Sequence, residues 1–303
     1  MSFYVVFNSF NNRSANASEC EEIMKYVIVT DSGCDLRTLN AKADDTEYTQ
    51  VPLKINIDGK EYTDTADIDI SQMIADMEGF KGKSTSACPS PDDWYNAYAQ
   101  GEYVFAVTIT SALSGSYNSA ATAKHMYLEE HPDKKICIID SLSTGPSMTM
   151  ITEKLNELIK KYDNFDTICT KITEYQKKLK LVFNLLSLDN LVKNGRVSKV
   201  VAAISSVLNI SIIGKASTEG TLEVTGKARG AKRAYVSMVE DLKKTIKGTR
   251  IVMCHCMNEE GAGILKRLIL EVLPSADISI MPASGLDSFY AQKGGILMGY
   301  ECI

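Results

Sequence analysis

The stretch Tyr26-Val27-Ile28-Val29-Thr30-Asp31-Ser32-Gly33-Cys34-Asp35 determines the fold class. A short apolar run passes directly into a turn rich in hydroxyls and carboxylates, which is typical of a buried strand that ends at a ligand-facing edge. Residues 103–109 and 135–139 repeat the pattern, and segments of helical period separate such runs. The alternation predicts βα units and an α/β domain with a parallel, doubly wound sheet.

Turn signals and helical periodicity place the other elements of the first half. Residues 51–57 and 60–63 flank Asp58-Gly59, which predicts a hairpin. Helices are expected at residues 71–77, 92–99, 116–129, 148–160 and 166–179, the last bridging to a second domain.

The second half predicts a C-terminal α/β domain with a mixed sheet. Its expected elements are a strand opening at Leu181, a helix at 197–208, a hairpin over 210–224, a helix at 231–246, a strand at 251–256, a helix at 262–272 and closing strands at 278–281 and 296–300. Because 303 residues exceed what one core usually supports, we expect two domains, 24–180 and 181–303. Residues 1–23 are polar and are expected to be a poorly ordered extension or to precede the true start at Met24.

Composition excludes several classes of protein. A net charge of −5 argues against a nucleic-acid binder, and the basic stretch 227–233 is either a solvated helix start or a specific anion contact. No apolar run is long enough to span a bilayer or to act as a signal sequence. Eight cysteines are too dilute for a secreted disulfide framework, so we expect a cytoplasmic protein.

Four turns rich in hydroxyl side chains are the candidate site: residues 30–35, 84–91, 110–116 and 140–144. Because the carboxyl ends of parallel strands meet at one edge of a sheet, we expect these turns to cluster. Their hydroxyls are either helix N-caps or, together with helix amides, ligands for an anion. Gly115 has no Cβ and would let the backbone approach that anion closely.

The sequence offers little support for catalysis. His125, His131 and His255 are the only histidines, and none adjoins a nucleophile elbow. Phosphate-loop, dinucleotide and kinase motifs are missing, so we expect neither an enzyme nor a cofactor.

Cysteines and acids in the turns and strands are weak candidates for other chemistry. Strand alternation separates the two thiols of Cys254-His255-Cys256 from the histidine, so buried thiols are favoured over a metal site. Cys34 is the one thiol to test for reactivity. Asp31, Asp35 and Asp140 are expected to bind turn amides rather than a metal.

The order of the motifs resembles the DegV family from about Met24 to Ile303. The motifs are Thr30-Asp31-Ser32, Asp58-Gly59, Thr85-Ser86, Ser111-Ala112-Leu113-Ser114-Gly115-Ser116-Tyr117, Asp140-Ser141, Asn194-Gly195-Arg196 and Lys227-Ala228-Arg229. The resemblance implies two α/β domains that bind a long-chain fatty acid and present its carboxylate to a separate ATP-using fatty acid kinase. We leave open whether the protein also makes transient contact with a membrane.

The resemblance also implies the contacts of that carboxylate. They fall on Ser86, or on Thr85 if the turn is shifted by one residue, and on Ser111, with Ser114 and Gly115 beside them. The apolar stretches 181–191 and 200–213 are natural linings for the acyl chain, although for any single residue a place in the ordinary core is the better expectation.

Two arginines and one missing histidine bear on the partner. Arg229 is the better candidate for contact with a kinase or an acyl phosphate, and Arg196 is the second; a surface ion pair is an equally good explanation of both. Many relatives carry a His-Thr-Gly segment near the C-terminus that is absent from residues 284–295, where Tyr290 could supply a hydroxyl. The remaining alternatives are a phosphotransfer or acyl-transfer enzyme and an interaction protein that binds no lipid.

Overall fold

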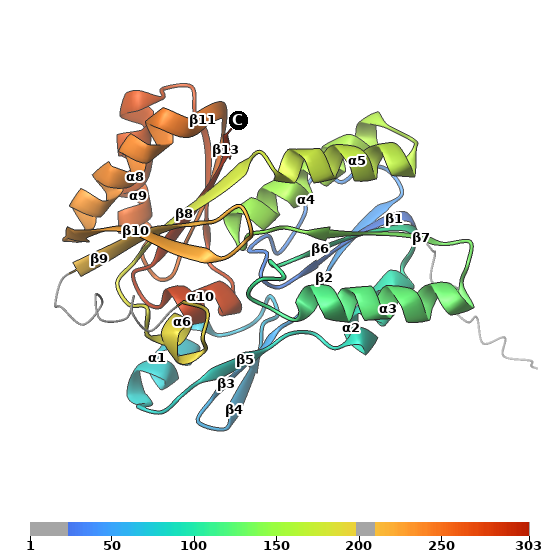
Figure 1. The fold of residues 1–303 in the computed structure, drawn as a ribbon, viewed down its shortest axis with the longest axis horizontal. Helices are drawn as coiled ribbons and strands as arrows, with labels where there is room; N and C mark the ends of the chain where they lie inside the picture. Colours follow the sequence, from blue (N-terminus) through green and yellow to red (C-terminus); the bar gives the residue numbers. More distant parts are fainter. Residues whose placement is uncertain (1–23, 198–209, 303) are drawn as a thin grey trace, which may run out of the picture.

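Three β-sheets organise the chain, as shown by a computed structural model that describes residues 24–197 and 210–302 (Figure 1). The expected N-terminal extension and residues 198–208 of the expected helix lie outside the described residues. Among the helices of the described ranges, none is long and apolar enough to cross a bilayer.

A four-stranded parallel sheet forms the first half of the fold. Its order is β2 (Thr46–Val51), β1 (Met24–Asp31), β6 (Gly101–Thr108) and β7 (Lys135–Asp140). Helices α2 (Pro91–Tyr98) and α3 (Ser116–Glu130) cover one face, and α4 (Pro146–Lys161) and α5 (Phe165–Gln176) cover the other (Figure 1). The prediction of a parallel, doubly wound sheet is confirmed.

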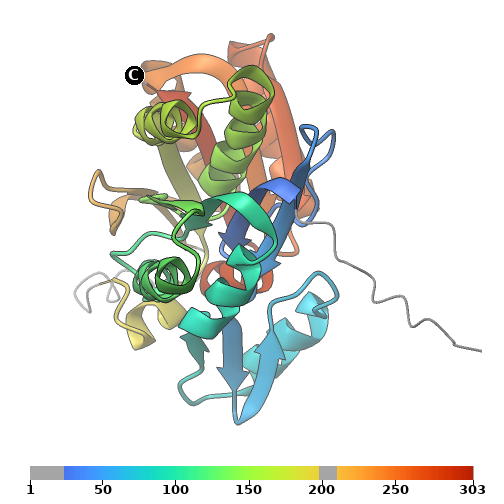
Figure 2. The same cartoon turned by 90° about the vertical axis from the view of Figure 1, so that its right-hand side faces the viewer.

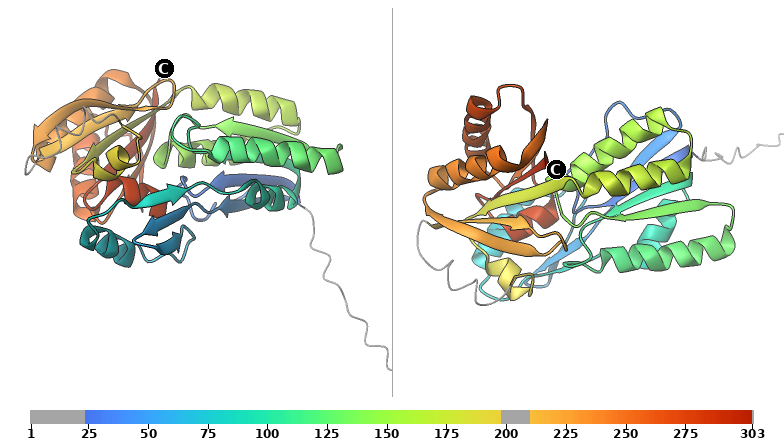
Figure 3. Two further views of the ribbon diagram at one scale, coloured as in Figure 1. Left: turned by 60° about the horizontal axis from the view of Figure 1, so that its bottom comes forward. Right: turned by 45° about the horizontal axis from the view of Figure 1, so that its top comes forward.

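A six-stranded mixed sheet forms the second half. Its order is β10 (Leu222–Arg229), β9 (Ile210–Ala216), β8 (Leu179–Leu185), β13 (Ile296–Cys302), β11 (Ile246–His255) and β12 (Asp277–Pro282). Only β11 and β12 pair in parallel, and α8 (Ala231–Thr245) and α9 (Glu259–Val272) cover one face (Figure 3). The predicted mixed sheet is confirmed. Helix α5 ends before the predicted Leu179 because that residue already begins β8.

A small antiparallel sheet, β4 (Lys60–Thr63), β3 (Lys54–Ile57) and β5 (Thr85–Ala87), lies with α1 (Ile70–Gly79) below the two larger ones (Figure 2). The hairpin is confirmed, and both Asp58 and Gly59 have positive φ, as a tight two-residue turn requires. The assignment of Thr85 and Ser86 to a turn is wrong. They form a strand because the free edge of β3 supplies their pairing partners.

Three further elements escaped sequence analysis: β2, α6 (Asp189–Lys193) and α10 (Gly285–Ala291). Strand β2 is half-buried along most of its length, so it lacks a clear apolar run. Helix α10 is short and buried on nearly every side, so it has no amphipathic period to detect.

Helix α10 is held between the sheets by carboxylates from the first half of the chain. The buried side chain of Asp64 accepts hydrogen bonds from the backbone N–H groups of Gly285 (2.8 Å) and Leu286 (2.9 Å) and forms an ion pair with Arg37. Asp35 accepts from the N–H of Ser284 at 2.7 Å. These bonds satisfy amides that a helix N-terminus leaves without partners. The two halves of the chain are therefore joined by directional bonds as well as by apolar packing.

Replacing Asp64 tests this joint. The change Asp64→Ala leaves two buried amides and one guanidinium without their acceptor, so we expect the free energy of unfolding to fall by about 3 kcal/mol. Urea titration followed by circular dichroism measures it. Glu61→Ala removes an exposed ion pair with Lys54 from the same small sheet and should stay within about 0.5 kcal/mol of wild type. Equal losses in the two variants would contradict the role of Asp64.

Candidate ligand-binding site

Three of the four hydroxyl-rich turns meet at the carboxyl edge of the parallel sheet. The Asp31 carboxylate, at the end of β1, accepts from the N–H of Ile109 (2.9 Å) and the hydroxyl of Ser116 (2.5 Å), both after β6. The N–H of Gly145, after β7, donates to the carbonyl of Gly33 at 2.7 Å. The chain winds outward in both directions from the gap between β1 and β6, which is where open α/β sheets bind ligands. The expected clustering is confirmed for these three of the four turns.

The acids of these turns serve backbone amides, as the sequence indicated. Asp140 accepts from the N–H groups of Ser111 and Leu142, each at 3.1 Å. Burial raises the pKa of Asp31 to about 6, although its hydrogen bonds act in the opposite direction. Hydrogen bonds from backbone amides to these carboxylates therefore hold the turns in fixed conformations.

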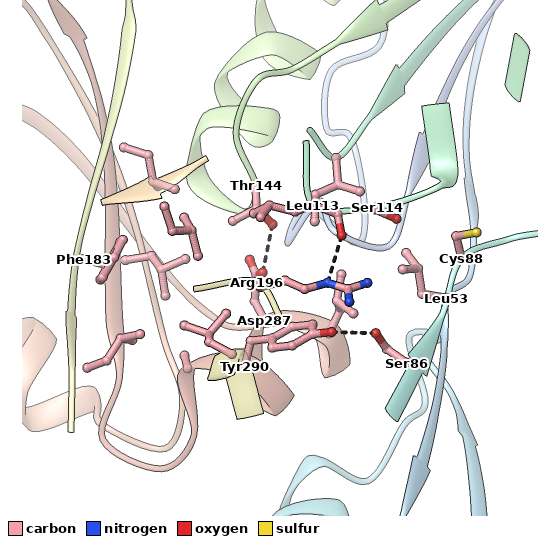
Figure 4. Close-up of a pocket in the computed structure, with 18 of the residues that line it drawn as sticks. Leu53, Ser86, Cys88, Leu113, Ser114, Thr144, Phe183, Arg196, Asp287 and Tyr290 are labelled. Atoms are coloured by element: carbon pink, nitrogen blue, oxygen red, sulfur yellow. Dashed lines mark hydrogen bonds between the residues drawn. The ribbon is translucent and has the colours of Figure 1, made fainter. Parts of the chain in front are cut away.

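A cavity of about 290 Å³ lies where this edge faces the small sheet and the six-stranded sheet (Figure 4). Its lining is mainly apolar and comes from both halves of the chain: Leu53, Ile109, Leu113, Leu181, Phe183, Leu185, Leu191, Leu222, Leu286, Ala291 and Leu297. Such a lining suits a small apolar ligand. Within β8 the alternate residues Leu181, Phe183 and Leu185 line the cavity, because successive side chains of a strand point to opposite faces.

The structure tests the two apolar stretches predicted as linings to different extents. Residues from 181–191 line the cavity, as predicted. Most of 200–213 lies outside the described residues, and Ile212 and Ile213 pack in the cores on the two faces of the six-stranded sheet.

A pair of hydroxyls marks one part of the cavity. The Ser86 hydroxyl on β5 and the Tyr290 hydroxyl on α10 are hydrogen-bonded at 2.8 Å (Figure 4). Thr85 points to the other face of β5 and is exposed. Of the two neighbouring candidates, only Ser86 lines the cavity.

The other predicted residues divide between the cavity and the surface. Ser114 and Gly115, at the start of α3, line the cavity, and so does Arg196, whose Nε donates to the Leu113 carbonyl at 3.0 Å (Figure 4). Ser111 lies in an exposed part of the same turn, outside the lining. Arg229 is exposed at the end of β10, beside the start of α8.

Three polar or thiol residues of the lining were not named as contacts from the sequence: Cys88, which lies in the candidate turn 84–91, Thr144 and Asp287. The Thr144 hydroxyl donates to the Asp287 carboxylate at 2.9 Å. Thr144 belongs to one of the four turns, but Asp287 lies in a helix that the sequence did not reveal. A single sequence holds no signal that would have singled it out.

The structure also decides the status of the cysteines. Cys34, the thiol singled out for a test of reactivity, is fully buried, and burial raises the pKa of its thiol to about 11, which argues against reactivity. Cys254 and Cys256 are buried thiols, as predicted, and His255 uses Nδ1 to accept from the N–H of Asn258.

Comparison with known proteins identifies the family. The family described as "Uncharacterised protein, DegV family" matches residues 25–299. The chain belongs to the DegV family. A DegV domain-containing protein of Streptococcus pneumoniae is 48% identical over 279 residues, which cover 92% of this chain and 99% of that protein.

Two solved structures extend the comparison. The Streptococcus pneumoniae Fatty Acid Kinase (Fak) B3 protein loaded with linoleic acid has a TM-score of 0.90 and 48% identity, covering 92% of this chain and 100% of that one. A DegV family protein from Eubacterium eligens loaded with heptadecanoic acid has a TM-score of 0.88 and 41% identity, over 92% of this chain and 100% of that one. The resemblance seen in the sequence is confirmed.

Thiol labelling tests the assignment of Cys34. We expect iodoacetamide at pH 8 to leave Cys34 unmodified in the folded protein and to label it after unfolding in urea. Cys137 is the matched control, because it is partly exposed and contact with the Cys169 thiol lowers its pKa. Mass spectrometry of the labelled peptides measures both. Labelling of native Cys34 as fast as that of Cys137 would contradict the assignment.

Proposed function

We propose that this protein binds a long-chain fatty acid in the cavity, with the carboxylate at Ser86 and Tyr290 and the acyl chain against the apolar lining. The observation that carries the proposal is the pair of hydrogen-bonded hydroxyls in an otherwise largely apolar cavity. Such a cavity matches a ligand with one polar end and one long apolar end.

The energetics of such a ligand fit the lining. Each methylene removed from water contributes about 0.8 kcal/mol, so the acyl chain supplies most of the affinity. Hydroxyls that donate to a carboxylate contribute about 1.5–3 kcal/mol each and fix the orientation of the ligand. The fatty acids held by the relatives from Streptococcus pneumoniae and Eubacterium eligens support the same assignment.

The proposal describes a carrier rather than a catalyst. It requires no cofactor, assigns the protein to the cytoplasm, and treats residues 24–180 and 181–303 as two domains whose contact forms the site. Ser111 remains a proposed contact of the carboxylate, although its side chain lies in the exposed part of its turn.

We propose further that the bound acid is presented to a fatty acid kinase catalytic subunit. The relative from Streptococcus pneumoniae carries the name Fatty Acid Kinase (Fak) B3, which supports this partner. Arg229 is our candidate for the contact, because it is exposed beside Lys232 and Arg233 and a guanidinium suits phosphate and carboxylate oxygens. Arg196 is the second candidate, on the cavity side.

Ligand analysis and two substitutions test the binding site. Mass spectrometry of a lipid extract should yield a long-chain fatty acid in stoichiometric amount. Ser86→Ala and Tyr290→Phe should each weaken oleate binding by roughly tenfold or more in calorimetry, because each removes one donor to the carboxylate.

Thr85→Ala is the matched control, since it removes a hydroxyl from the exposed face of the same strand, and it should leave the affinity unchanged. Ser111→Ala tests the remaining contact: an effect as large as that of Ser86→Ala would establish it. A protein that carries no acyl lipid and binds no oleate would overturn the proposal, and a phosphorylated side chain would instead support a transferase.

The partner contact has a separate test. Arg229→Ala should leave the affinity for oleate unchanged and should lower the rate of acyl phosphate formation by a fatty acid kinase catalytic subunit with ATP at least tenfold. Arg267→Ala, an exposed arginine on α9, is the matched control and should keep the wild-type rate. Equal rates for the two variants would remove Arg229 from the contact.

A further inference from the structure

Two carboxylates at the joint between the halves of the chain each have one oxygen without a partner. Asp35 and Asp287 are each 4% exposed, and Oδ2 of both lacks a hydrogen bond among the described residues. Their other oxygens are bound: Asp35 Oδ1 accepts from Ser284 at 2.7 Å, and Asp287 Oδ1 accepts from Thr144 at 2.9 Å. A buried polar atom without a partner is costly, so these two oxygens call for an explanation.

The two unpartnered oxygens face the same small space. One oxygen of Asp35, one oxygen of Asp287 and the Cys254 sulfur lie within 4.8 Å of one another. Both Oδ2 atoms border the Cα of Gly145, where a Cβ would collide with each. Two acceptor atoms are therefore brought together where a donor would satisfy both.

The surrounding charges do not compensate two ionised carboxylates. Asp31 and Asp64 add negative charge, while Arg37, the cation that acts on Asp35, is already paired with Asp64. The Cys254 thiol is buried beside Asp35, and burial and the neighbouring carboxylates raise its pKa, so it stays protonated. Its S–H is a weak donor that lowers the pKa of Asp35, but by less than burial raises it. Burial raises the pKa of Asp287 well above its usual range, and that of Asp35 to about 6.

We propose that Asp35 and Asp287 share one proton, which bonds the two carboxyls across the domain joint and keeps the wall of the cavity at Asp287 neutral. Like charges at close range cannot both ionise, and one proton supplies the donor that the two oxygens lack. Asp287 also lines the cavity, so an ionised Asp287 would repel an anionic ligand. This second consequence rests on the proposed function.

The shared proton gives stability a definite dependence on pH. The unfolded chain releases this proton near pH ~4, whereas the folded chain keeps it to a higher pH. Folding therefore takes up a proton, and each unit of rising pH lowers the folding equilibrium constant about tenfold until the folded pair titrates. Above pH 6.5 the contribution of Asp31 is nearly complete. Buried thiols such as Cys34 and Cys256, whose pKa values burial raises, and His255, whose pKa burial lowers, also affect stability in this range, so the contribution of the pair is measured as the difference between the wild type and a variant that lacks the pair.

The variant Asp287→Asn tests the shared proton. Its amide can donate to Asp35 Oδ2 in place of the proton but cannot titrate. From pH 6.5 up to the pH at which the folded pair titrates, the folding constant of the wild type should fall more steeply than that of the variant, by up to about tenfold per pH unit. Asp58→Asn, at the exposed turn between β3 and β4, removes a carboxyl elsewhere and should keep the wild-type slope.

Infrared spectroscopy provides a direct readout. The wild type at pH 7 should show the C=O band of a protonated carboxylic acid, shifted in heavy water and absent from Asp287→Asn. Overturning results are a spectrum with carboxylate bands alone, parallel pH slopes for wild type and variant, or one equivalent of divalent metal retained after dialysis.

Oleate binding separates this inference from the proposed function. From pH 6.5 to 9 the affinity of the wild type should fall by roughly tenfold, as a charge develops near the carboxylate, while Asp287→Asn should vary less. An affinity that falls equally in both would overturn the role of Asp287 in the cavity. A protein that binds no oleate at any pH but keeps the infrared band would overturn the proposed function, while the inference of a shared proton would still hold.

Discussion

The fold and the cavity both depend on the buried N-terminus of α10. A helix cannot end inside a protein unless acceptors meet its free amides, and here the acceptors are Asp64 and Asp35, more than 200 residues earlier in the chain. The contact between the two halves of the chain is thereby fixed in register. Tyr290 lies little more than one turn further along α10, so the same bonds that seat the helix set its hydroxyl opposite Ser86.

The choice of carboxylates as acceptors has consequences for the whole joint. An ionised acid binds an amide more strongly than a neutral acceptor does, but burying several acids together is unfavourable unless their charge is neutralised. Arg37 neutralises Asp64, and hydrogen bonds from Gly33, Ile109 and Ser116 support Asp31. Among the residues that the structure describes, no cation forms an ion pair with Asp35 or Asp287, which is why the joint, rather than either separate core, is where protonation should matter.

The sequence predicted the elements that carry their own local signal. Strands β1, β6 and β7 each contain a continuous apolar run, and α2 begins at Pro91, a residue that favours the first turn of a helix. Strand β5 could not be predicted, because its three residues form a strand only by pairing with the edge of β3. Helix α10 could not be predicted either, because a short helix that is buried on nearly every side has no polar face.

The same limit applies to the prediction of the site residues. The motif located Thr85 and Ser86, but only the pairing of β5 fixes which of the two faces the cavity, and Asp287 lies in the element that was missed.

Neutral hydroxyls are a suitable anchor for a carrier that must also release its ligand. A cation buried at the same place would hold a carboxylate by charge, and the tail would add to an already tight complex. Arg196 is near enough to line the cavity, yet its guanidinium already donates to the carbonyls of Leu113 and Asn194. In the arrangement that we propose, the acyl chain would supply affinity in proportion to its length, and the hydroxyl pair would fix the orientation of the carboxylate. A carboxylate held in this way remains available to a partner that offers a stronger set of oxyanion ligands.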